Sequence, residues 1–210
     1  MIRETRTERA GDALPLNRIE ALSDGMFAII MTLLVIEIKP PEVHDAAQVA
    51  EALRHSLVAL LPKIVAYAIS FLTLAIFWVS HHQHFHALQH ADRGVLWLNN
   101  LLLLFLAFVP FPTAVLGEYP TQPLAVALYG AALGLCALTM ALLRRYTLAA
   151  GLHREVPEAA LRTALIKSAA GPALYLLGAG VGWFFPPAGI ALYAAIALFY
   201  FLPVPARNPR

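Results

Sequence analysis

One segment near the N-terminus most strongly constrains what this chain can fold into. Residues Leu22 to Ile36 form an apolar run that, with its flanks, can cross a bilayer as a helix, but its first turn contains Ser23 and Asp24. An ionisable side chain inside a membrane is costly, so it normally faces protein or water and indicates a function. We therefore expect a membrane-spanning helix whose Ser23 and Asp24 side chains point into protein.

The same helix carries a continuous stripe on its other side. Counted at about 100° per residue, the stripe lies within about 60° of the direction of Ile29, whereas Ser23 and Asp24 lie about 120° to 140° away. Its members are Leu22, Gly25, Met26, Ile29, Thr32, Leu33 and Ile36. Such a stripe can face lipid, another helix or the axis of a pore, and the pattern alone leaves these alternatives open.

Composition extends the membrane interpretation to the whole chain. The sequence is 60% hydrophobic and 13% charged, with a mean hydropathy of +0.67, which is too apolar for an ordinary soluble domain. Its apolar runs predict an all-α polytopic membrane protein with six transmembrane helices, at 16–38, 53–80, 94–115, 124–143, 164–185 and 188–202. Together they form one domain, residues 16–203, between a tail at 1–15 and a tail at 204–210.

The distribution of basic residues predicts the orientation. Of the 15 Lys and Arg residues, all but Lys39, Arg54 and Lys63 lie on the side of the membrane that holds both termini. The positive-inside rule therefore predicts a multi-pass protein of the cell membrane with both termini in the cytoplasm. Because this rule already accounts for the net charge of +2, we predict no nucleic-acid partner.

Motifs for catalysis do not stand out. The single cysteine, Cys136, excludes an intramolecular disulfide and lies in an apolar run, where we expect it to pack. We find no arrangement of nucleophile, base and orienting group, and no glycine-rich phosphate loop. The sequence therefore predicts neither an enzyme nor a cofactor.

Three of the predicted helices place polar residues in one layer of the membrane. Ser23 and Asp24 lie about 10 Å along the first helix, at about 1.5 Å per residue. The second helix ends, and the third begins, on the same side of the membrane. The layer contains Arg18, Ser23, Asp24, His81, His82, Asn99 and Asn100. Arg18 is six residues from Asp24 and would not face it on one helix, so the two could pair only across subunits.

Three roles for this layer compete. A metal site would use Asp24 with the histidines of a polar connector, His81, His82, His84 and His86, because imidazole binds zinc, copper or nickel. No cysteine or second carboxylate accompanies them. A proton relay through Asp24 and the histidines would serve a transporter. We favour a structural lock that holds the first helix against the second and third, and we predict no metal.

The first helix resembles the signature of the transmembrane protein 175 family, which comprises lysosomal and prokaryotic potassium channels. The resemblance lies in the run RIEALSDGMFAIIMTLLVIEIKPP. The family's mark is Arg, three residues, Phe-Ser-Asp, three residues, Ala-Ile, and it matches here at Arg18, Ser23, Asp24, Ala28 and Ile29, with Leu22 in place of Phe. The pieces FWVSHH, WLNNLLLL and VPFPTAVLGEYP are also similar, so the resemblance covers about the first 120 residues.

This resemblance implies a fold and a function. Prokaryotic members are six-span subunits that form tetramers, in which the first helix of each subunit lines a central pore permeable to potassium ions. Apolar layers replace the carbonyl-lined filter of other potassium channels, and no TVGYG-like loop occurs in this sequence. The resemblance places the constriction at Ile29, Leu33 and Ile36, with Thr32 contributing to selectivity. These residues belong to the stripe described above.

We therefore hypothesise that these apolar residues form a hydrophobic gate in the pore. The polar lock would fix the rotation that points the stripe at the pore axis, and Glu37 would add a negative rim at the outer mouth or simply be a solvated charge at the helix end. The alternative is a proton-coupled secondary transporter that uses Asp24, His81 and His82. A third alternative is a membrane scaffold that conducts nothing.

Overall fold

Every regular element of the structure is a helix. The computed structural model describes residues 16–41, 49–154 and 158–201, without the side chains of 158–165 and 167, so the two predicted tails lie outside the described residues. The helices are α1 (Leu16–Ile36), α2 (Val49–Ala59), α3 (Leu61–His86), α4 (Arg93–Phe108), α5 (Pro110–Glu118), α6 (Pro123–Ala149), α7 (Glu158–Phe184) and α8 (Pro186–Phe201). The all-α prediction is therefore confirmed for the described part of the chain.

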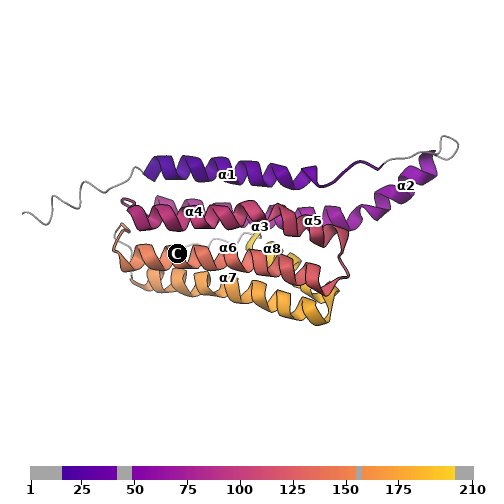
Figure 1. The fold of residues 1–210 in the computed structure, drawn as a ribbon. Coiled ribbons are helices and arrows are strands. Elements are labelled where there is room, and N and C mark those ends of the chain that lie inside the picture. Colours follow the sequence, from indigo (N-terminus) through magenta and orange to yellow (C-terminus); the bar gives the residue numbers. More distant parts are fainter. Residues whose placement is uncertain (1–15, 42–48, 155–157, 202–210) are drawn as a thin grey trace, which may run out of the picture.

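The long helices run alongside one another in three layers (Figure 1). Helix α1 packs on α3, α4 and α5, and these in turn contact α6 and α8, while α7 packs along α6. Four segments are long and apolar enough to cross a membrane: Leu16–Ile36, Leu61–His86, Arg93–Glu118 and Pro123–Ala149. The predicted fifth and sixth spans correspond to α7, with 27 residues, and α8, with 16. The count of six spans stays a prediction.

Prolines set several of the boundaries. The predicted second span, 53–80, is in fact divided at Leu60 into α2 and α3, and Pro62 occupies the first turn of α3, where a missing N–H costs nothing. Pro110 likewise begins α5, and Val109 joins it to α4 with helical backbone angles, so Arg93–Glu118 forms one interrupted span. In Figure 1, α2 extends away from the bundle, and none of its residues is buried.

Two helices continue further than the sequence predicts. Helix α3 includes the histidine run up to His86, which the polar pattern placed in a connector, and α6 continues six residues beyond Leu143 to Ala149. The physical reason is burial. Phe85 and Leu143 belong to a buried apolar cluster at this end of the bundle, together with Ile19 of α1. That cluster holds the last turns of both helices in place despite their polar neighbours.

Glycines allow α7 and α8 to approach closely. A Cβ added to Gly189 would lie 2.6 Å from the Cα of Gly182 and 3.0 Å from the carbonyl oxygen of Gly178, so backbone meets backbone at this crossing. Gly178 and Gly182 form the small-xxx-small spacing that favours close packing of membrane helices. Tyr193 fills the adjacent space and is fully buried.

We expect Gly189→Ala to lower the stability of the bundle. The new methyl group cannot be accommodated by moving a side chain, so overpacking should cost about 1–3 kcal/mol. Gly180 is the matched control, because a Cβ there meets nothing within 4 Å and alanine favours the helix. Thermal unfolding of the purified protein in detergent measures both variants. Equal melting temperatures would contradict the close contact.

Candidate functional site

Helix α1 has one buried face and one exposed face. Five residues at helical spacing pack into the bundle: Ile19, Ser23, Phe27, Ile30 and Leu34. The opposite face carries the predicted stripe, in which Ile29 is 55% exposed, Leu33 42% and Ile36 65%. Six of the seven stripe residues are exposed, and only Met26, at the edge of the stripe, is partly buried against the core. The rest of the stripe is free to meet lipid, other subunits or a pore.

A buried hydrogen-bonded chain fixes the inner face of α1. Ser23 Oγ donates its proton to the carbonyl oxygen of Ile19 at 2.8 Å, which leaves it to accept from Asn99 Nδ2 at 3.1 Å. Asn99 Oδ1 in turn accepts from His81 Nε2 at 2.8 Å. Ser23 and Asn99 are fully buried and His81 is 1% exposed. Side chains of α1, α3 and α4 thus satisfy one another in one layer of the bundle.

The direction of the Asp24 side chain differs from the prediction. Its side chain is exposed in the single chain rather than pointing into protein, because one residue along a helix turns the side chain by about 100° and Ser23 already occupies the inward direction. Asp24 Oδ1 accepts a hydrogen bond of 2.9 Å from Trp78 Nε1 of α3. Trp78 was not among the residues singled out in the sequence. The sequence did contain a signal for this contact: Trp78 lies four residues before His82, on the same face of the helix, and its indole N–H can donate a hydrogen bond.

The remaining members of the predicted layer are not joined to this chain of hydrogen bonds. Asn100 is partly buried, and Arg18 and His82 are exposed. The His82 ring stacks between Trp78 and His86, at centroid distances of 6.0 and 6.4 Å. Within the predicted layer, Asn99 therefore bonds directly to both Ser23 and His81, while Asp24 is linked to α3 through Trp78.

The four histidines of α3 face three directions. His81 turns towards Asn99, His84 towards Thr147 of α6, and His82 and His86 outward. Among the described residues, no three His, Cys, Asp or Glu side chains gather into a group that could hold a metal ion. The metal alternative, which needs these histidines together with Asp24, does not match this geometry.

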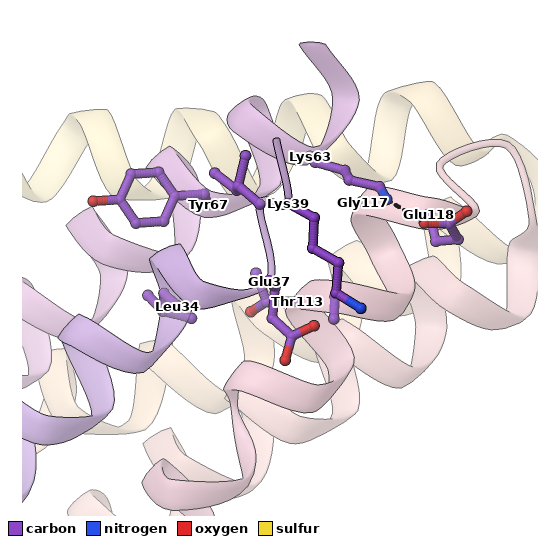
Figure 2. A pocket seen from close by; sticks show the side chains of 10 residues that line it. Leu34, Glu37, Lys39, Lys63, Tyr67, Thr113, Gly117 and Glu118 are labelled. Carbon is purple, nitrogen blue, oxygen red and sulfur yellow. Dashed lines mark ion pairs between the residues drawn. The ribbon is translucent and has the colours of Figure 1, made fainter. Parts of the chain in front are cut away.

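At the other end of α1, Glu37 lines a small pocket (Figure 2). The pocket has a volume of about 160 Å³ and lies between the end of α1, the start of α3 and α5. Lys39, Lys63 and Glu118 also line it, and Lys63 Nζ pairs with Glu118 Oε2 at 2.5 Å. Glu37 is exposed, so its carboxylate belongs to a mixed-charge rim rather than to an isolated negative site.

We expect Asn99→Ala to destabilise the protein far more than Asn100→Ala. Removing the Asn99 amide leaves Ser23 Oγ without its donor and His81 Nε2 without its acceptor, and each buried unsatisfied group costs about 1–3 kcal/mol. Asn100 is the matched control, since it is adjacent and only partly buried. Melting temperatures in detergent compare the two variants. A similar loss in both would contradict the selective role of Asn99.

Comparisons with known proteins agree with the resemblance seen in the sequence. A family model described as endosomal/lysosomal potassium channel TMEM175 matches residues 18–110. A potassium channel of Streptomyces collinus is 37% identical over 200 residues, covering 91% of this chain and 95% of that protein. The human endosomal/lysosomal proton channel TMEM175 is 36% identical over 116 residues, which are 53% of this chain but only 23% of the human protein.

The fold gives the same result. The crystal structure of a lysosomal potassium-selective channel TMEM175 homolog from Chamaesiphon minutus superposes with a TM-score of 0.78 at 31% identity, covering 88% of this chain and 95% of that one. These relatives are ion channels and not enzymes. With a bacterial relative matched over nearly its whole length, the chain belongs to the TMEM175 family of ion channels.

Proposed function

We propose that this chain forms a potassium-permeable cation channel whose pore is lined by the exposed stripe of α1. One observation carries the proposal. The stripe residues Ile29, Leu33 and Ile36 are exposed in the single chain, although the opposite face of the same helix is buried. In a family whose bacterial members are named potassium channels, such a face is best explained as the pore lining.

The gate is hydrophobic in this proposal. Rings of Ile29, Leu33 and Ile36 exclude water when narrow and let a partly hydrated ion pass when they spread. Thr32 adds a polar group to this otherwise apolar lining and contributes to ion selectivity. Its hydroxyl donates to the carbonyl oxygen of Ile29 at 2.8 Å, so the lone pairs of Thr32 Oγ1 remain available to a passing cation. No carbonyl-lined filter is needed.

The hydrogen bonds at the base of α1 orient the gate. Ser23 reaches Asn99 of α4, and Asp24 reaches Trp78 of α3, so two successive residues of α1 are held from two helices. Because they lie about 100° apart around the helix, rotating α1 cannot improve one contact without loosening the other. We infer that this pair is the lock that keeps the stripe directed at the pore axis.

The assembly follows from the family and from the charges. We propose a homotetramer of six-span subunits in the cell membrane, with both termini in the cytoplasm and Glu37 at the outer mouth. The excess of Lys and Arg on the side of the termini supports this orientation. Arg18, which is exposed near the start of α1, would then face a neighbouring subunit or the inner entrance.

Proton permeation is a second candidate, since the animal relatives are named proton channels. Such a path would use Asp24, His81 and His82 near the base of α1. The alternative of a proton-coupled transporter gains less support, because the matched relatives are named channels.

The reversal potential of the reconstituted protein tests these proposals. A planar bilayer with potassium on one side and sodium on the other, at equal pH, should give a current that reverses near the potassium equilibrium potential. Reversal near zero would contradict selectivity. With a pH gradient imposed, a reversal that follows the proton gradient would favour the proton channel, and saturable uptake without current would favour the transporter.

We expect Ile29→Asn to raise the basal potassium current about tenfold, the change produced by lowering a barrier by about 1.4 kcal/mol. A polar ring would keep the constriction wet when it is narrow. Val35→Asn is the matched control. Val35 is 49% exposed, but it lies about 120° around α1 from Ile29. Single-channel recording in bilayers measures both, and an equal rise in the two variants would contradict the gate position.

A further inference from the structure

Two histidines converge on one hydroxyl at the end of the bundle where α1 begins. Thr147 Oγ1 of α6 lies 3.3 Å from His84 Nε2 of α3 and 3.2 Å from His153 Nε2, which follows α6. The two imidazole rings are 5.3 Å apart and nearly perpendicular. Thr147 is fully buried and His84 is 7% exposed. Neither histidine takes part in the lock at the base of α1.

Only one arrangement of protons allows Thr147 Oγ1 to make all three of its hydrogen bonds at once. A threonine hydroxyl has one proton to donate and two lone pairs to accept with. Thr147 Oγ1 donates its proton to the carbonyl oxygen of Arg144 at 2.9 Å. It must therefore accept from both histidines, so each ring carries a proton on Nε2. A further proton can bind only at Nδ1, and His153 Nδ1 is buried without a partner among the described residues.

The histidine pair joins two connectors. His153 forms an isolated antiparallel bridge with Leu88, in which Gln89 N donates to Leu152 O at 2.9 Å and Arg154 N donates to Ala87 O at 3.0 Å. The loop after α3 is thereby tied to the loop after α6, at the left end of the bundle in Figure 1. We call this contact, residues 87–89 with 152–154, the connector clasp.

Arg144 places a permanent positive charge near His84. The titratable and charged groups that act on His84 are Arg144, His153 and His81. The carboxylate of Asp92, in the loop after α3, is turned elsewhere, because its two oxygens accept from Val95 N and Tyr146 Oη. Among the described residues, no carboxylate is in position to compensate a second positive charge in this cluster.

We propose that His84 and His153 form a two-histidine proton-binding site whose occupation opens the connector clasp. Protonation would place two imidazolium rings beside each other, with Arg144 near His84, and would give His153 Nδ1 a proton that no described residue accepts. Water can satisfy both charges once the clasp opens. Acid on this side of the membrane therefore loosens the two loops from each other.

The sign of the pH dependence follows from burial. Burial lowers the pKa of His153 below its ordinary value of 6.5. A group with a lowered pKa in the closed form binds its proton more readily when the clasp is open. Its stabilising contribution is complete above about pH 6.5 and is lost as the pH falls below that value. Each proton taken up on opening contributes at most about a tenfold change per pH unit.

The clasp lies next to α1. Leu88 and Leu152 belong to the same buried apolar cluster as Ile19, the residue whose carbonyl oxygen accepts from Ser23. Opening the clasp would therefore remove packing beneath the start of α1. This inference does not rest on which ion the channel conducts, since proton binding and opening can be followed without a current.

Hydrogen exchange with mass spectrometry tests the proposal on the full chain in detergent. Peptides that contain the amides of Gln89 and Arg154 should lose at least tenfold protection between pH 7.5 and 5.5, after correction for intrinsic exchange. In the double variant His84→Gln and His153→Gln, the Gln amide keeps an N–H donor near the position of imidazole Nε2 but cannot be protonated. Its protection should change less than twofold.

Two further variants keep the test decisive. His90→Gln removes an exposed imidazole from the same loop and should retain the response of the unchanged protein. If the double variant fails to fold, the single variant His153→Gln replaces it, since this residue lies after α6 and outside the helices. Its loss of protection between pH 7.5 and 5.5 should be clearly smaller than that of the unchanged protein. An unchanged protection in the natural protein, or the same loss in the histidine variants, would overturn the proton-binding site.

Discussion

The orientation of α1 depends on Asn99. In the bundle interior, Ser23 and His81 each need a partner, and a single carboxamide serves both because it has a donor and an acceptor at opposite ends. The hydrogen bonds then run in one direction, from His81 through Asn99 and Ser23 to the Ile19 carbonyl oxygen. Such a chain is complete only at one rotation of α1. The same rotation exposes Ile29, Leu33 and Ile36, so the polar interior determines where the apolar surface of the helix points.

Part of this site could be predicted from the sequence and part could not. Counting residues along each span gives depth, so the sequence correctly placed Ser23, His81 and Asn99 in one layer, and the family assignment is confirmed. The depth of a residue along its helix does not tell which neighbouring helix its side chain faces. It therefore could not separate Asn99 from its neighbour Asn100, or find Trp78, whose indole supplies the partner of Asp24. Those choices depend on which face of α3 or α4 meets α1, and tertiary packing decides that.

The histidine run shows a second limit of sequence patterns. Polarity suggested that the second span ends before His81, because His81, His82, His84 and His86 interrupt the apolar run. Helix α3 nevertheless continues, since two of these side chains find buried partners on α4 and α6. A polar residue ends a membrane span only if it must remain in water. Here the protein itself supplies partners for the imidazoles of His81 and His84, and the signal for that lies on distant segments, at Asn99 and Thr147.

The contacts of α1 are unevenly distributed along its length. Its side-chain hydrogen bonds to other helices come from Ser23 and Asp24, and the apolar cluster around Ile19 adds support at the same end. Near Glu37, by contrast, α1 borders a pocket of about 160 Å³. Between the two lies Thr32, whose hydroxyl bonds to its own helix. A helix held at its base and packed only by apolar contacts further along can tilt without breaking a polar bond. Such a tilt would displace Ile36 more than Ile29, which is the motion that the proposed constriction of stacked apolar rings would require in order to open from one end.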